Sequence, residues 1–101
     1  MQTRQLEYFV AVAEDLSFTR AAKRFFVSQA ALSQQIKLLE KEAGTRLFER
    51  DSHHVELTPA GRLLLGDAKT ILRYEQESLI RARRRSKGID GTLAIGYIKG
   101  Y

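Results

Sequence analysis

The sequence contains no cysteine and no apolar run long enough to cross a lipid bilayer. Without cysteine, the chain has no disulfide scaffold, no thiolate zinc site and no cysteine nucleophile. A membrane-spanning helix needs about 18 to 20 consecutive apolar residues, and no segment approaches that length. We therefore expect no membrane partner, a cytoplasmic location and a fold that is stabilised by packing.

Sequence signatures of catalytic and metal sites are also missing. The chain has no glycine-rich phosphate loop, no nucleophile with a nearby base and no cluster of residues at metal-ligand spacing. Its two histidines, His53 and His54, are adjacent, and neighbours on a strand or tight turn point to opposite sides. They would therefore rarely bind one metal ion together. The sequence predicts a protein that is not an enzyme and that holds no cofactor or metal in this chain.

What the 101 residues do contain is an excess of positive charge, with 17 Lys and Arg against 12 Asp and Glu. Such an excess suggests an anionic partner. Residues 1–58 carry eight basic and eight acidic residues, whereas residues 59–87 carry eight basic and three acidic ones. Because the charge is so unevenly distributed, net charge alone does not identify the binding surface.

Three helices are predicted near the start of the chain. Apolar residues recur at helical spacing over residues 2–13. Ser17 is a good N-cap for a short second helix that ends near Phe26, and a third helix follows over residues 29–42. Gly44 would end this third helix. The second and third helices thus meet across a turn of a few residues.

The third helix has two contrasting faces. One face is a narrow apolar stripe formed by Leu32, Ile36 and Leu39. The adjacent face carries amides, a hydroxyl, small side chains and two cations: Gln29, Ala30, Ser33, Gln34, Lys37 and Lys41. These residue types suit a helix in a DNA groove, because amides pair with adenine edges and alanine contacts thymine methyl groups. An ordinary solvated helix face is the alternative.

Two short strands and a long helix are predicted next. Residues 47–50 and 55–57 have the pattern of strands joined by a polar turn, which would form a small wing. Thr58 and Pro59 supply an N-cap and a first helical position. The helix that they begin is expected to continue to about Ser86, with Gly88 beyond its end.

An apolar stripe with heptad spacing runs along this long helix. It comprises Leu65, Ala68, Leu72, Leu79 and Ala82, with Glu75 as its one polar member and Leu64 and Ile71 beside it. A helix of about 28 residues spans roughly 40 Å, which is longer than the small domain covers. We therefore expect the stripe to pair with a second copy of the chain in a homodimer. Packing on the three-helix core is the alternative, but it would not account for Leu79 and Ala82.

The pattern predicts a mainly α fold in three parts. Residues 1–58 form a winged helix-turn-helix with a three-helix core and a two-stranded wing, and residues 59–87 form a dimerising linker helix. Residues 88–101 form a hinge and, over the apolar run 91–98, the first strand of a further domain that this chain lacks.

An ordered set of short motifs runs through the chain: SFTRAA, VSQ, ALS, I-x-x-LE, G-x-x-LFER and LT-x-AG. They lie in LEYFVAVAEDLSFTRAAKRFFVSQAALSQQIKLLEKEAGTRLFER and the later VELTPAG. Over residues 1 to about 98 the sequence resembles the DNA-binding region of LysR-type bacterial transcriptional regulators. The resemblance implies a homodimer, and a tetramer for the intact protein, whose recognition helices enter successive major grooves of an interrupted palindrome in double-stranded DNA. It also implies a bacterial cytoplasmic protein that is bound to the nucleoid when active, and a small-molecule effector that binds outside this chain.

The resemblance also implies roles for individual residues. Bases would be contacted from the third helix by Gln29, Ala30, Ser33 and Gln34. Phosphates would be contacted by Ser17, Thr19, Ser28, Lys37 and Arg50. Ser17 and Ser28 are also expected N-caps, and capping is compatible with a phosphate contact.

The sequence departs from the common family pattern at several of these positions. Ala30 stands where proline is usual, and Gln34 stands where arginine is frequent, so that an amide suited to adenine replaces a guanidinium. His53 and His54 occupy wing positions that often hold arginine, so a contact between wing and DNA would depend on pH. A wing that points into solvent is the alternative. Phe26 stands where a polar residue is common, and we expect its ring to be partly exposed.

A coiled-coil oligomerisation module without specific DNA readout is the alternative function. In that case the long helix would be the functional element and the helix-turn-helix would only pack. The amides on the exposed face of the third helix argue against it, and titration with duplex DNA distinguishes the two.

Overall fold

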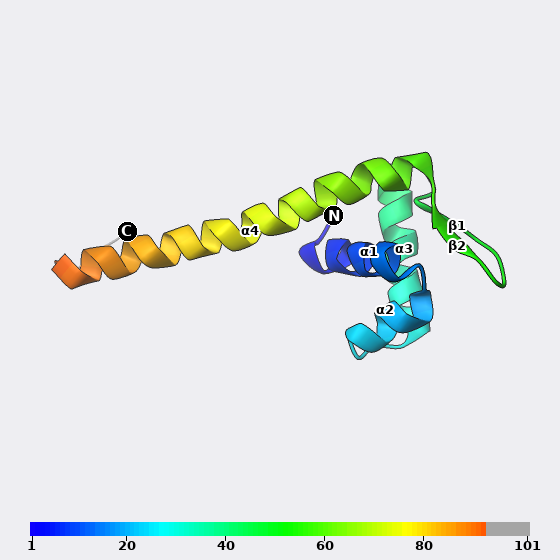
Figure 1. Ribbon diagram of the computed structural model, residues 1–101, viewed down its shortest axis with the longest axis horizontal. Helices are drawn as coiled ribbons and strands as arrows, with labels where there is room; N and C mark the ends of the chain where they lie inside the picture. The colour runs from blue at the N-terminus through cyan, green and yellow to red at the C-terminus, as the bar shows by residue number, and fades with distance from the viewer. Residues whose placement is uncertain (93–101) are drawn as a thin grey trace.

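The computed structural model describes the backbone of residues 1–92 and the side chains of residues 1–86. Its elements are, in order, α1 (Thr3–Asp15), α2 (Phe18–Arg24), α3 (Gln29–Ala43), β1 (Phe48–Arg50), β2 (Val55–Leu57) and α4 (Pro59–Thr92). Figure 1 shows α1, α2 and α3 grouped together, the β1–β2 hairpin extending to one side and α4 projecting far beyond them in the other direction. The predicted three-helix core, two-stranded wing and long helix are therefore confirmed.

Side-chain hydroxyl groups fix where three of the helices begin. Ser17 Oγ accepts a hydrogen bond from the Arg20 amide at 3.1 Å, and Ser28 Oγ accepts one from the Ala31 amide at 3.0 Å. At the start of α4, the Gly61 amide donates to Thr58 Oγ1 at 2.9 Å. These are the predicted N-caps, and they satisfy amides that have no partner in the first helical turn.

The turns that end α2 and α3 place different residues in the left-handed conformation. After α3 this residue is Gly44, with a φ of 74°. After α2 it is Phe26, with a φ of 56°, and the next amide, that of Val27, donates to the Ala22 carbonyl at 3.1 Å. A residue with a side chain costs about 1 to 2 kcal/mol in this conformation, which glycine adopts freely. The Phe26 ring is 95% exposed, as expected from the sequence.

One hydrophobic core joins the helices to the hairpin. The Phe48 ring of β1 lies 5.4 Å from the Phe9 ring of α1 and 5.6 Å from the Phe18 ring of α2, measured between centroids. Leu32 and Ile36 of α3 are fully buried against this cluster. The hairpin is antiparallel, with Phe48 opposite Leu57, so its buried end is continuous with the helical core.

A glycine allows α4 to begin close against the hairpin. A Cβ atom at Gly61 would lie 2.1 Å from the Leu47 carbonyl oxygen, far inside the 3.0 Å that a Cβ atom keeps from a non-bonded neighbour. Thr58 fixes the same junction, because its hydroxyl donates to the Arg46 carbonyl at 2.7 Å. The direction in which α4 leaves the core is thus set by contacts with the segment that precedes β1.

Helix α4 is longer than predicted, and its expected end at Gly88 is wrong. The helix continues to Thr92, so Gly91 and Thr92, the start of the predicted strand, are helical instead. A glycine inside a helix costs only about 1 kcal/mol relative to alanine, and no proline follows to interrupt the backbone hydrogen bonds. The rest of the predicted strand, residues 93–98, lies outside the described residues.

Within the described residues, no helix is both long and apolar enough to span a bilayer.

The apolar stripe of α4 divides between two environments. Ala68 is fully buried in the core of the same chain, so its assignment to the dimer surface is wrong. Leu64, Leu65 and Leu72 are half-buried against that core, because the start of α4 packs on α1. Beyond them Leu79 is 55% exposed. The predicted alternative, packing on the three-helix core, therefore holds for the first half of the stripe only.

Candidate nucleic-acid interface

Helix α3 presents the predicted polar face to solvent. Leu32, Ile36 and Leu39 point into the core, with exposed fractions of 0 to 2%. On the other side the exposed residues are Gln29, Ala30, Gln34 and Lys37, with Ser33 half-buried between them. The structure therefore brings the four predicted base-contacting residues to one surface of one helix.

The start of α2 lies beside the start of α3. Thr19 Oγ1 and Gln29 Oε1 are 3.2 Å apart and hydrogen-bonded, and both residues are exposed. A hollow between these two helix starts and the wing is lined by Ser17, Thr19, Gln29, Arg50 and His53, among others. Predicted phosphate-contacting and base-contacting residues thus surround the same hollow. Ser28 lies exposed at the cap of α3, and Lys37 is exposed two turns further along.

Arg50 links the wing to α3. Its guanidinium carbon lies 4.3 Å from the centroid of the Phe18 ring, and its Nη1 donates to Ser33 Oγ at 3.2 Å. Arginine favours such a position because its planar cation stacks on aromatic faces while its N–H groups donate at the edge. The predicted phosphate-contacting arginine is therefore also a neighbour of a predicted base-contacting serine.

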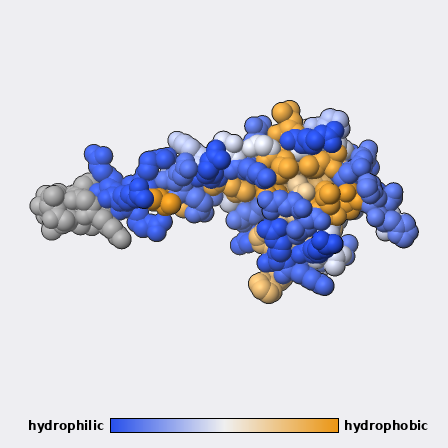
Figure 2. All heavy atoms as spheres, in the orientation of Figure 1, coloured by the Kyte–Doolittle hydropathy of each residue, from blue (hydrophilic) through white to orange (hydrophobic). Residues whose placement is uncertain are grey.

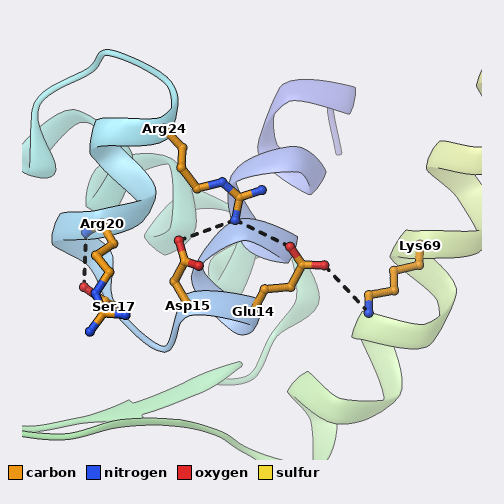
Figure 3. A network of polar contacts seen from close by, with 6 residues as sticks. All are labelled: Glu14, Asp15, Ser17, Arg20, Arg24 and Lys69. Carbon is orange, nitrogen blue, oxygen red and sulfur yellow. Dashed lines mark hydrogen bonds and ion pairs between the residues drawn. The ribbon is translucent and has the colours of Figure 1, made fainter.

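Acidic residues of α1 are engaged with cations at the α1–α2 and α1–α4 contacts. Arg24 Nη1 lies 3.5 Å from Glu14 and 3.4 Å from Asp15, and Lys69 of α4 lies 3.9 Å from Glu14. Figure 3 shows Arg24 and Lys69 converging on these carboxylates, whereas the Arg20 guanidinium lies outside the network. These carboxylates therefore act in the packing of the helices.

Within residues 1–86, several cations of α2, α3 and the wing have no carboxylate partner. Among the ion pairs of the described residues, none involves Arg20, Lys23, Lys37, Lys41 or Arg50. Their charges are available to phosphate groups, which dominate the affinity of proteins for DNA. A segment that is neutral by residue count thus still carries positive charge around α2 and α3.

Glu40 of α3 has a role that its sequence position alone does not reveal. Its Oε2 accepts hydrogen bonds from the amides of Leu47 at 2.8 Å and Phe48 at 3.2 Å. The carboxylate therefore anchors the first strand of the wing to α3. The only signal in the sequence was an acidic residue on an otherwise cationic and neutral face.

At the wing, the two histidines have different surroundings. His54 Nε2 lies 2.8 Å from Glu56 Oε2, whereas the His53 backbone amide donates to Asp51 Oδ1 at 2.9 Å. The hydrogen bond to Glu56, then the charge of Glu56 and to a smaller extent that of Asp51, raise the pKa of His54 above its ordinary value of 6.5. Both imidazoles are exposed. No group of three or more potential metal ligands occurs among the described residues.

Helix α4 carries a second exposed feature, an apolar hollow on its projecting half. It is lined by Thr70, Ile71, Tyr74, Glu75, Ser78 and Leu79. Glu75, the polar member of the predicted stripe, accepts a hydrogen bond from Thr3 Oγ1 at 2.8 Å, which accounts for its place there. Figure 2 shows hydrophobic residues gathered over the compact end of the molecule and only small hydrophobic areas on the largely hydrophilic α4. The heptad pattern does not single out Tyr74, which lies beside the stripe and is 63% exposed.

Known proteins similar to this chain are bacterial regulators. The HTH-type transcriptional regulator BudR of Klebsiella aerogenes is 51% identical over 96 residues, which make up 95% of this chain and 67% of BudR. The regulator TfdT of Cupriavidus pinatubonensis is 45% identical over 97 residues, 96% of this chain and 42% of TfdT. The chain therefore spans only part of the length of these relatives.

Some of the solved structures that are similar to this one contain DNA. A crystal structure of a CbnR_DBD–DNA complex matches with a TM-score of 0.83 and 43% identity, over 85% of this chain and 99% of that chain. A BenM_DBD/catB site 1 DNA complex matches with a TM-score of 0.81 and 40% identity, over 85% of this chain and 97% of that one. Residues 3–62 match the family described as "Bacterial regulatory helix-turn-helix protein, lysR family". The chain belongs to the lysR family of bacterial regulatory helix-turn-helix proteins.

Proposed function

We propose that this chain binds double-stranded DNA sequence-specifically as a homodimer and is the DNA-binding part of a bacterial LysR-type transcriptional regulator, not an enzyme. The observation that carries the proposal is the exposed face of α3. Gln29, Ala30 and Gln34 are exposed there, beside a half-buried Ser33 and the exposed Lys37. The similarity to the CbnR and BenM domains, whose structures contain DNA, supports it.

Residues of two kinds contribute in different ways. The amides of Gln29 and Gln34 pair with base edges in the major groove, and Ala30 contacts a thymine methyl group. Ser17, Thr19, Ser28, Lys37 and Arg50 contact phosphates and fix the position of α3 on the duplex. His53 and His54 extend these contacts along the wing.

The dimer forms through the projecting half of α4. The hollow that includes Ile71, Tyr74 and Leu79 is apolar, and these three side chains are exposed within one chain. Pairing with a second copy removes this surface from water and places two α3 helices on successive major grooves. Leu64, Leu65 and Leu72 hold the first half of α4 against the core, and Ala82 continues the exposed surface of its second half. The alternative of an oligomerisation module without specific DNA readout uses the same helix, but it leaves the polar surface of α3 without a role.

For the intact protein we propose a tetramer that responds to a small-molecule effector bound outside this chain, in the bacterial cytoplasm and at the nucleoid. The length of the relatives, of which this chain covers 67% and 42%, leaves room for an effector-binding domain.

Selection of bound sequences from a random pool of DNA duplexes tests the proposed function. We expect an interrupted palindrome to be enriched. A chain that enriches no sequence, yet still self-associates, would favour the oligomerisation module instead.

Two substitutions on the exposed face of α3 then separate readout from affinity. Gln34→Ala should relax the preference at one position of each half-site by about 1 to 3 kcal/mol, because it removes a contact to a base edge. Lys37→Ala should weaken all duplexes alike and lower the slope of log affinity against log salt by about one, because it removes a phosphate contact. Equal losses on selected and scrambled duplexes for Gln34→Ala would exclude this residue from readout.

A further inference from the structure

Arg50 and Ser33 form a hydrogen bond whose direction is fixed by chemistry. A guanidinium group carries only donors, so Ser33 Oγ must be the acceptor in its 3.2 Å contact with Arg50 Nη1. A serine hydroxyl has one hydrogen atom in addition to its acceptor lone pairs. The bond to Arg50 therefore leaves that hydrogen free to be donated elsewhere.

Hydroxyl groups on α4 show what usually happens to this hydrogen inside a helix. Thr70 and Ser78 donate to the carbonyl groups four residues earlier, at 3.1 Å and 2.8 Å. Ser33 has no such bond to the Gln29 carbonyl among the hydrogen bonds of the described residues. Its donor is therefore uncommitted, on the half-buried strip of α3 between Gln29 and Gln34.

The guanidinium that sets this arrangement is itself held in place. It lies 4.3 Å from the centroid of the Phe18 ring, and Phe18 is only 6% exposed because its ring packs against Phe48. Within the described residues no carboxylate forms an ion pair with Arg50, so none of these carboxylates draws it away from Ser33. The backbone of Arg50 is fixed because it pairs with Val55 on the neighbouring strand.

We propose that Arg50 is a positioning residue for base readout, which fixes Ser33 as a hydrogen-bond donor toward the DNA. The proposal rests on the proposed function and deepens it. A Ser33 that donates selects a base with an acceptor on its major-groove edge, namely guanine, adenine or thymine. Cytosine presents only its amino group there, so it could bond Ser33 only through the one lone pair that Arg50 leaves, and we expect it to be disfavoured. A phosphate contact by Arg50 would add affinity without any such preference.

The test measures base preference position by position. Starting from the duplex enriched in the selection experiment, each position of one half-site is replaced by cytosine, and each purine by its 7-deaza analogue, which lacks the N7 acceptor. For the parent chain we expect one position at which the loss of the acceptor weakens binding about three- to tenfold. Ser33→Ala should abolish the penalty at that position and leave the others unchanged.

Arg50→Lys distinguishes positioning from phosphate binding, because it retains the positive charge but loses the planar group that stacks on Phe18. We expect the penalty at the Ser33 position to fall to less than half of its parental value. The double variant Ser33→Ala/Arg50→Lys should show the same base preference as Ser33→Ala alone. If Arg50→Lys weakened all duplexes by the same factor and kept the full penalty, Arg50 would be a phosphate contact only. The proposal would then be wrong.

A second variant guards against a trivial loss of folding. Phe18→Leu keeps an apolar side chain in the core but removes the aromatic face beneath the guanidinium, and it should reduce the same penalty while Arg50 is still present. Circular dichroism of each variant checks that the helices persist. A parent chain that enriches no sequence would contradict the proposed function itself, whereas an intact preference in both variants would contradict only the role of Arg50.

Discussion

The two halves of α4 carry similar apolar residues but have different surroundings. Ala68 and Leu79 belong to the same stripe, yet Ala68 is fully buried and Leu79 is 55% exposed. The difference arises because α1 lies beneath the first half of the helix, while the second half projects beyond the core (Figure 1). The same sequence pattern therefore stabilises the fold at one end of the helix and is available for association at the other.

The largest expected contrast is between an aromatic residue of the core, Phe48 of β1, and one of the projecting half of α4, Tyr74. Phe48→Ala should lower the free energy of unfolding by about 3 to 5 kcal/mol, because Phe48 is fully buried between Phe9 and Phe18. Tyr74→Ala should change it by no more than about 0.5 kcal/mol in the monomer, because that ring is 63% exposed. Urea unfolding at low protein concentration measures both. A large loss for Tyr74→Ala in a monomer would show that α4 packs on its own chain further than the structure indicates.

Changes in the projecting half of α4 should affect association of two chains but not the stability of one chain. Leu79→Asp should dissociate the dimer, since a carboxylate buried at the paired surface costs several kcal/mol. The unfolding of the monomer should hardly change, because Leu79 is exposed within one chain. Sedimentation at tens of micromolar protein measures the effect.

The matched control for this prediction is Gln76→Asp, which adds the same carboxylate at an exposed position of α4 that does not line the hollow. It should leave the dimer intact. Dissociation by both variants would mean that net charge, not the apolar surface, controls pairing. A parent chain that is monomeric at tens of micromolar would contradict the dimer altogether.

Two glycines of α4 allow a smaller comparison of the same kind. Gly61→Ala should lower the free energy of unfolding by about 1 to 3 kcal/mol, because the new Cβ would collide with the Leu47 carbonyl oxygen. Gly66→Ala meets nothing within 4 Å and should stabilise the helix by about 0.5 to 1 kcal/mol. Thermal unfolding of the two variants should shift in opposite directions, and a stabilised Gly61→Ala would show that the junction of α4 with the hairpin is not tight.

Local chemistry made much of the fold predictable from the sequence. Ser17, Ser28 and Thr58 are predictable N-caps, because a hydroxyl just before an amphipathic segment can accept a hydrogen bond from a free amide of the first turn. The exposed face of α3 followed from the spacing of its apolar residues. The end of α4 did not, because Gly88 is only a weak helix breaker when nothing else interrupts the helix.

Contacts between distant residues could not be read in the same way. The sequence places Glu40 and Arg50 on elements of known type, but it does not show that Glu40 binds the amides of Leu47 and Phe48, or that Arg50 stacks on Phe18. It likewise does not show which cations lack a carboxylate partner. These features depend on how helices and hairpin pack, and they decide how positive charge is distributed around α3.

The smallest expected effect is the pH dependence of DNA binding, which we attribute to His54 in the wing. His54 shares a hydrogen bond with Glu56, which faces Glu49 across the hairpin, and Asp51 and Arg50 lie nearby. Because Glu56 and then Asp51 raise the pKa of His54, the imidazole keeps its proton to a pH above its ordinary value of 6.5. While charged, we expect it to offset these carboxylates, which would repel the phosphate backbone of a duplex beside the wing. The stabilising contact with Glu56 is fully present below pH 6.5 and is lost as the pH rises through the raised pKa.

DNA affinity should therefore be higher at pH 6 than at pH 8, at fixed ionic strength. His54→Gln should reduce this dependence, and Glu56→Gln should move the titration midpoint of the His54 ring, followed by NMR, back toward 6.5 because the main cause of the raised pKa is removed. His53→Gln is the matched control, since its backbone amide, not its ring, bonds to Asp51. It should leave the midpoint of His54 unchanged. A pH dependence that persisted in the double variant His53→Gln/His54→Gln would place the titrating group outside the wing, and the wing would then not control how binding responds to pH.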